Sequence, residues 1–291
     1  MTSPSPPWLG AALAREPRSV VTTVDGVDHH RLEWGTLGCP VLVVLHGGGA
    51  HAGWWSAVAG LLADRWHVVA LDMVGHGRSS HLDRYSFTGW VDQVMAVVEE
   101  VGGPSPVVVG HSMCGVVAAM VGAAHGERLG GVVVVDTPLD IPPPESIGHA
   151  EQIMAARRYA DSAEALTGRF RLLPAQPVVH PSLLAHLADH AVVEHAEGWT
   201  WAFDPALFVG QPDDRPRDVG VVLQAARCPT TVIVADDSPV VPVEQRDRLT
   251  HMAAADPDLE LLVEPGHHHL MLDHPRELAE TLSRVASAYR R

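Results

Sequence analysis

One stretch, residues 107–115, constrains the fold of this chain more than any other. It reads VVVGHSMCG, and its three leading β-branched residues are typical of a buried strand in a parallel sheet. The apolar residues 116–121 follow and predict a helix against that sheet. A strand, an abrupt turn with a serine at the bend and a helix form a nucleophile elbow, whose small flanking residues avoid clashes. The pattern therefore predicts that Ser112 is a nucleophile at a helix N-terminus, where negative charge is stabilised, rather than an ordinary helix cap.

Apolar strands and helices alternate along most of the remaining chain, which predicts an α/β fold with a mostly parallel sheet and helices on both faces. Residues 1–18 are expected to form an arm outside the core. The alternation breaks at the proline run 142–144, after which the periodicity is helical without a convincing buried strand. We therefore predict two core segments, 1–138 and 223–291, separated by a helical cap, residues 139–222. The expected strands include residues 41–45, 67–71, 131–135, 230–234 and 259–263.

Composition excludes several classes of partner. A net charge of −15 over 291 residues argues against nucleic acid or an acidic membrane surface. No apolar stretch reaches the length of a membrane span, and the N-terminus has no secretory signal pattern. Three cysteines cannot all pair, so the chain is expected in a reducing cytoplasm. We expect a small-molecule substrate, and the composition leaves a homo-oligomer open.

A serine nucleophile needs a base, an orienting acid and an oxyanion hole. The base is expected on the loop after the last strand, where His267, His268 and His269 are adjacent. A Gly-His pair favours His267, whereas the seven positions to Pro275, which opens the next helix, favour His268. We prefer His268 and keep His267 as the alternative. A metal site is disfavoured, because adjacent histidines on an extended loop point opposite ways and no cysteine or carboxylate set accompanies them.

The acid has two candidates. The loop after the penultimate strand is the common location, but counting back from Pro242 places Ser238 at the expected position and Asp237 one residue early. A slip of one residue would turn that carboxylate away from the histidine. The strand after the elbow helix ends in Asp136, which should lie at the carboxyl end of a strand next to the elbow. We favour Asp136 and keep Asp237 as the alternative; a turn-forming role is the competing interpretation of both.

The oxyanion hole should combine two backbone N–H groups. One belongs to Met113, the residue after the nucleophile. The other should come from the glycine-rich loop after the strand at 41–45, where Gly48 is the preferred donor and Gly49 its neighbour. Trp54 follows this loop and is expected to line an acyl pocket, with core packing as the alternative.

Four motifs occur in a fixed order along the chain. They are His46-Gly47-Gly48-Gly49, Asp72-Met73-Val74-Gly75-His76-Gly77-Arg78-Ser79, Gly110-His111-Ser112-Met113-Cys114-Gly115 and Gly266-His267-His268. In this set and order the chain resembles the α/β-hydrolase superfamily over about residues 19–290. The resemblance implies that residues 139–222 cover the site. There are two departures: Cys114 replaces the usual second glycine of the elbow, and Ser238 stands where the family usually carries its acid. Some members carry the acid after the earlier strand, in agreement with Asp136.

The resemblance and the site residues together imply a serine hydrolase. It would cleave an ester, thioester or lactone of a small, largely apolar substrate through an acyl-enzyme. No metal or organic cofactor is implied. The alternative is a C–C bond lyase, acyl transferase or cyclase that uses the same three side chains. A ligand-binding receptor is the third interpretation and ranks lower, because such family members often have damaged triads, whereas a serine, a histidine and an acid are all present here.

Overall fold

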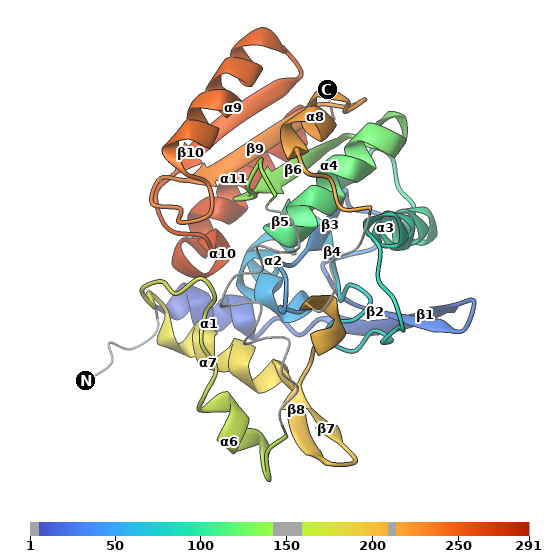
Figure 1. The fold of residues 1–291 in the computed structure, drawn as a ribbon, viewed down its shortest axis with the longest axis vertical. Coiled ribbons are helices and arrows are strands. Elements are labelled where there is room, and N and C mark those ends of the chain that lie inside the picture. Colours follow the sequence, from blue (N-terminus) through green and yellow to red (C-terminus); the bar gives the residue numbers. More distant parts are fainter. Residues whose placement is uncertain (1–5, 142–158, 209–213, 291) are drawn as a thin grey trace.

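The computed structural model describes residues 6–141, 159–208 and 214–290. Eight of the strands in these residues form one sheet: β1 (Arg18–Val24), β2 (Val27–Trp34), β3 (Val41–Leu45), β4 (His67–Leu71), β5 (Val107–His111), β6 (Gly131–Val135), β9 (Thr230–Ala235) and β10 (Leu259–Glu264). Their order is β1-β2-β4-β3-β5-β6-β9-β10 (Figure 1). β2 pairs antiparallel with both of its neighbours, β1 and β4, and every other neighbouring pair is parallel. The predicted α/β fold with a mostly parallel sheet is confirmed.

Helices cover both faces of this sheet. They are α1 (Pro7–Leu13), α2 (Ser56–Leu62), α3 (Phe87–Val101), α4 (Met113–His125), α8 (Val219–Gln224), α9 (Val243–Ala255), α10 (Leu270–Asp273) and α11 (Pro275–Ala288), with short 3-10 turns η1 (Ala52–Trp55) and η2 (Gly126–Arg128). Residues of α3, α4, α8 and α9 pack on one face, and residues of α1, α2, α10 and α11 pack on the other (Figure 1). No helix in the described ranges is long and apolar enough to cross a membrane.

The central strands are buried along their whole length. β3, β4, β5 and β6 have no exposed residue, and most of their side chains are β-branched. Alternate residues of one strand serve the two faces: Val43 belongs to one core cluster, and Leu42 and Val44 belong to the other. In the parallel register His111 pairs with Val135, and Val135 pairs with Ile233. The carboxyl ends of β5, β6 and β9 therefore lie side by side, and a site can form there from residues distant in sequence.

The segment between β6 and α8 contains strands as well as helices. It holds α6 (Ala163–Thr167), α7 (Pro181–His190), the antiparallel hairpin of β7 (Val192–His195) and β8 (Gly198–Trp201), and the turn η4 (Pro205–Phe208). α6, α7, β7 and β8 lie together at the end of the molecule opposite α9 (Figure 1). The hairpin departs from the helical expectation. Its strands carry valine, tryptophan and threonine, and Gly198 has a φ of +119° that only glycine adopts readily. Part of the predicted cap, residues 142–158 and 209–213, lies outside the described residues, and its predicted boundaries stay a prediction.

The predicted N-terminal arm, residues 1–18, is wrong from Pro7 onward. Pro7 opens helix α1, where a missing N–H costs nothing and the fixed φ favours a helix. Leu9 is fully buried against α2, and a Cβ on Gly60 would overlap the Ala12 carbonyl, so the two helices meet at backbone contact distance. Part of the expected arm is therefore a helix that packs on the core.

Candidate active site

Ser112 lies at the bend between β5 and α4. Its φ of +53° is unusual for a residue with a side chain and marks a strained turn. Glycines make the bend sterically possible: a Cβ on Gly110 would overlap the Cys114 carbonyl, and one on Gly115 would overlap the Thr137 hydroxyl. Cys114, the departure from the family pattern, is fully buried in the core, and burial raises the pKa of its thiol. The turn therefore holds the serine in one geometry while the cysteine acts as a small apolar side chain.

His268 connects Ser112 to Asp136. Its Nε2 lies 3.0 Å from the Ser112 Oγ, and its Nδ1 lies 2.7 Å from the Asp136 Oδ2. The carboxylate is an acceptor, so Nδ1 carries the proton and Nε2 presents its lone pair to the serine hydroxyl; the tautomer is assigned from these bonds. Both His268 and Asp136 are buried, with exposed fractions of 2% and 0%. The structure thus brings together the three residues preferred from the sequence.

The carboxylate of Asp136 is held by the neighbouring strand β9 and by the loop that follows it. Its Oδ1 accepts the N–H of Ala235 at 2.9 Å, and its Oδ2 accepts the hydroxyl of Ser238 at 2.7 Å. Ser238 occupies the position where the acid was first expected, and it donates to the carboxylate instead of supplying one. This contact of Ser238 was not predicted from the sequence, although adjacent strand ends were the available signal.

The alternative base and acid lie next to each other and away from Ser112. His267 places its Nδ1 2.9 Å from the Asp273 Oδ2 and its Nε2 3.4 Å from the Asp237 Oδ2. The side chain of Asp237 is 84% exposed. These contacts of the His267 and Asp237 side chains do not include Ser112 or the His268 ring, so the geometry favours neither alternative.

The glycine-rich loop approaches Ser112 from β3, and two buried histidines hold it. His46 accepts the N–H of Met73 at its Nε2 and donates from Nδ1 to the Gly47 carbonyl. Gly49 donates its N–H to His76 Nε2 at 3.1 Å, so that N–H is not directed at the cavity. Gly48 lies next to Met113: a Cβ atom placed on Gly48 would be 3.4 Å from the Met113 sulfur. Of the two glycines, Gly48 is the one in the position expected of a donor.

The cavity beside Ser112 has a volume of about 190 Å³. Its wall is mostly apolar and comes from α3, α4 and the segment between β6 and α8. The lining residues are Gly48, Phe87, Trp90, Ser112, Met113, Val116, Pro138, Ile141, Leu173, Pro174, Leu207, Phe208, Arg215, Val240 and His268. Trp54 is not one of them, because its ring packs edge-on against His269 at 5.0 Å and against Phe170 at 6.4 Å. Core packing, the alternative for Trp54, agrees with these contacts.

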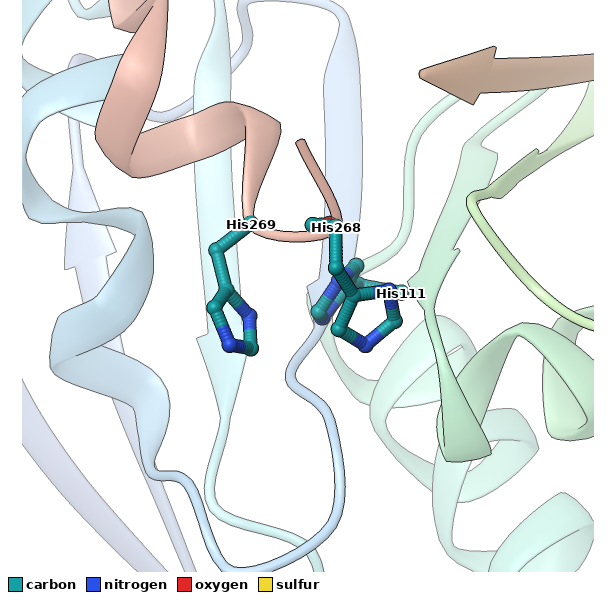
Figure 2. Close-up of side chains that lie close together, drawn as sticks. All are labelled: His111, His268 and His269. Carbon is teal, nitrogen blue, oxygen red and sulfur yellow. The ribbon is translucent and has the colours of Figure 1, made fainter. Parts of the chain in front are cut away.

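Two further histidines lie beside His268, as Figure 2 shows. His111, the residue before Ser112 in the elbow motif, donates from Nε2 to the backbone carbonyl of His268 at 2.9 Å and so ties the base loop to β5. His269 lies on the other side, and the three residues offer nitrogen atoms within 4.8 Å of one another. Because both nitrogens of His268 already contact Asp136 and Ser112, a metal ion bound by all three histidines would have to disrupt that chain. The sequence did not predict this contact of His111 with the His268 backbone.

A second serine–histidine–aspartate array lies on the opposite part of the sheet. Ser19 Oγ lies 2.8 Å from His30 Nε2, and His30 Nδ1 lies 2.6 Å from Asp72 Oδ2. Burial raises the pKa of Asp72, but contacts led by the His30 hydrogen bond outweigh it and lower that pKa to about 2. Asp72 also accepts the N–H groups of Ala52 and Arg78, which fixes two loops. His30 and Asp72 line a cavity of about 470 Å³, and Ser19, an exposed residue of β1, is not among its lining residues.

Buried neutral histidines make the folded state sensitive to acid. Burial, which disfavours the charged imidazolium, is the main reason why five histidines have lowered pKa values: His46, His51, His76, His111 and His269. The pKa of His51 falls to about 4. The unfolded chain binds these protons near pH 6.5, whereas the folded chain does not, so stability decreases as the pH falls from about 6.5 toward 4. We expect the free energy of unfolding, measured with urea, to be at least about 2 kcal/mol lower at pH 5 than at pH 7.5.

A substitution pair tests the origin of this acid effect. His51→Gln should weaken the dependence of unfolding free energy on pH, because one proton-binding difference is removed. His251→Gln, at an exposed position on α9, should leave the dependence as in the wild type. Equal stability of the wild type at the two pH values would contradict the expectation.

Comparisons with known proteins agree with this fold. The model of the alpha/beta hydrolase family matches residues 42–281. The chain is 40% identical over 108 residues to a serine hydrolase-like protein of Danio rerio, but this match covers 36% of the chain and 33% of that protein. It is 27% identical over 209 residues to the lipase LipV of Mycobacterium tuberculosis, covering 72% and 78% of the two chains. The thioesterase domain from the curacin biosynthetic pathway superposes with a TM-score of 0.76 at 22% identity, covering 92% and 99% of the two chains, which shows a shared fold.

Proposed function

We propose that this chain, which belongs to the alpha/beta hydrolase family, is a serine hydrolase that cleaves carboxylic esters, thioesters or lactones through an acyl-enzyme. The observation that carries the proposal is the chain of contacts from Asp136 through His268 to Ser112. Related proteins with names such as lipase and esterase/perhydrolase support the coarser conclusion of hydrolase activity on esters. The cavity volume of about 190 Å³ supports a small acyl group.

In the first step, the Ser112 Oγ attacks the carbonyl carbon while its proton passes to His268 Nε2. Asp136 keeps the Nδ1 proton of His268 in place and stabilises the imidazolium that forms, without itself accepting the proton. The imidazolium then donates its proton to the departing alkoxide or thiolate, and the acyl group stays on Ser112. Water, deprotonated by the same nitrogen, attacks the acyl-enzyme and releases the acid.

The negative oxygen of each tetrahedral intermediate would be held by the N–H groups of Met113 and Gly48. Met113 is the first residue of α4, and first-turn N–H groups have no acceptor within a helix. The α4 N-terminus also favours negative charge at this position. One such donor is worth about 3 kcal/mol of the activation barrier, so two can supply a large share of the rate enhancement.

Covalent labelling tests the proposal directly. A fluorophosphonate is expected to modify the wild-type protein at Ser112, identified by mass spectrometry of the proteolysed adduct, because Ser112 has both a base and oxyanion donors. Ser112→Ala should abolish labelling. Ser19→Ala is the matched control, since Ser19 also contacts a histidine that contacts an aspartate. Its labelling should equal the wild type, and an adduct on Ser19 instead of Ser112 would refute the proposal.

A further inference from the structure

Two cavities meet at Trp90 of helix α3. One is the cavity beside Ser112, with its volume of about 190 Å³. The other has a volume of about 290 Å³ and lies between α3, the turn after β1 and the loop after β4. Among the described residues, Trp90 is the single one that lines both cavities. Trp90 is therefore a wall that the two cavities share.

The aromatic neighbours of the Trp90 indole belong to different cavities. Phe87, which lines the cavity beside Ser112, packs edge-on against the indole with ring centroids 5.0 Å apart. Tyr85, which lines the second cavity, stacks on the indole with ring centroids 6.3 Å apart and an interplanar angle of 26°. The indole thus packs against the lining of both cavities.

The Trp90 indole is fixed in this place. It is 3% exposed, and its Nε1 donates to the Val74 carbonyl at 3.1 Å. Val74 is fixed in turn, because its N–H donates to the Gln93 Oε1 at 2.9 Å. Moving the indole would leave buried polar groups without partners and remove packed aromatic contacts, both of which are costly. We therefore expect a permanent wall at Trp90.

A closed end limits the length of an acyl chain. The described lining of the cavity beside Ser112 is mostly apolar, so it suits a hydrocarbon chain. An apolar pocket with a fixed end discriminates by length, because a chain that is too long must displace packed side chains. The volume of about 190 Å³ is below the roughly 300–1,000 Å³ of typical small-molecule sites, whereas the two cavities joined would fall within that range.

We propose that Trp90 determines which acyl chains the enzyme accepts, by separating the cavity beside Ser112 from the second cavity. The substrates are then esters or thioesters whose apolar acyl chain has only a few carbons. This inference rests on the proposed serine hydrolase function. The acyl carbon is bonded to Ser112 Oγ in the intermediate, and the chain ends against the indole. Trp90 is a specificity-determining residue in this arrangement, and it takes no part in the transfer of protons.

Two nitrophenyl esters with the same leaving group test this role. We expect the wild type to show a kcat/KM at least about tenfold higher for the butyrate than for the octanoate. Trp90→Ala should raise the octanoate-to-butyrate ratio of kcat/KM at least about tenfold, because the second cavity becomes open to the chain. Trp90→Phe keeps a ring at this place and should retain most of the wild-type preference. Both esters are measured on one preparation, so the ratio does not depend on the fraction of folded enzyme.

Two positions on the same helix provide controls. Met95 is 5% exposed on α3 and lines neither cavity, so Met95→Ala should keep the wild-type ratio. Ala96 is exposed and lines the second cavity. Ala96→Trp should leave the ratio of the wild type unchanged. In the Trp90→Ala background it should cancel the gain on the octanoate, because the new side chain fills the second cavity again.

Fluorophosphonate labelling of Ser112 in each variant separates this inference from the proposed function. A labelled Trp90→Ala with the wild-type ratio, an equal gain in Met95→Ala, or a wild type that hydrolyses both esters equally would overturn the role of Trp90 and leave the hydrolase standing. If Trp90→Ala does not fold, Trp90→Leu, which removes less volume, has the same expected direction. Absence of both labelling and turnover in the wild type would instead refute the proposed function itself.

Discussion

Replacing His268 with alanine is expected to reduce kcat for ester hydrolysis by about 10⁶-fold, since base and nucleophile act as one unit. Without the Nε2 atom 3.0 Å from Ser112 Oγ, the hydroxyl has no acceptor for its proton, and the leaving group has no donor. The residual rate would come from the oxyanion donors and substrate binding. Steady-state hydrolysis of a nitrophenyl ester measures the loss, and thermal unfolding of the variant verifies that it is folded.

The neighbouring histidine provides the control for this prediction. His267→Ala should change kcat by less than about threefold, in the range of surface substitutions away from a site. Its side chain contacts Asp273 and Asp237 rather than Ser112. A collapse of activity in His267→Ala, with His268→Ala still active, would move the base by one residue and refute the assignment.

Asp136→Asn should lower kcat by about 10⁴-fold while leaving the binding cavity intact. The asparagine oxygen can still accept the N–H of Ala235 at the Oδ1 position, which leaves the amide nitrogen at the Oδ2 position, where it donates to the Ser238 hydroxyl instead of accepting from it. Its amide nitrogen then faces His268 Nδ1 as a donor, which favours the tautomer with the proton on Nε2. That tautomer cannot accept a proton from Ser112. The rate of fluorophosphonate labelling should fall in parallel with kcat, because both depend on the same proton transfer.

Asp237→Asn separates the two candidate acids. The Asp237 side chain is 84% exposed and lies near His267, so its substitution should change kcat by less than about twofold. If Asp237→Asn abolished labelling and Asp136→Asn did not, the acid would belong to the loop after β9. Similar large losses in both variants would show that neither contact alone explains the orientation of His268.

Local patterns account for what could be predicted. The valine run of β5 and the small residues around Ser112 are adjacent in sequence, and both are needed for so sharp a turn, so the pattern identifies the elbow. The preference for Asp136 depended on one additional argument, that parallel strands end at the same edge of a sheet. The structure brings Ser112, Asp136 and His268 within hydrogen-bonding distance, and their catalytic roles stay predictions until the substitutions above are measured.

The remaining features depend on packing between distant segments. Whether Trp54 lines the cavity is decided by Phe170 and His269, which follow it by more than a hundred residues. The direction of the Gly49 N–H is decided by His76. Helix α1, expected to be part of an arm outside the core, is stabilised by α2, against which Leu9 is buried. No window of neighbouring residues contains this information.

The distance along the chain between the three site residues has a consequence for biosynthesis. His268 follows Ser112 by 156 positions and Asp136 by 132. A ribosome releases the serine and the acid long before the base, so an incomplete chain holds a serine that nothing activates. The reactive hydroxyl arises only when the loop after β10 docks on the finished sheet. Labelling of Ser112 during refolding would therefore time the docking of this loop.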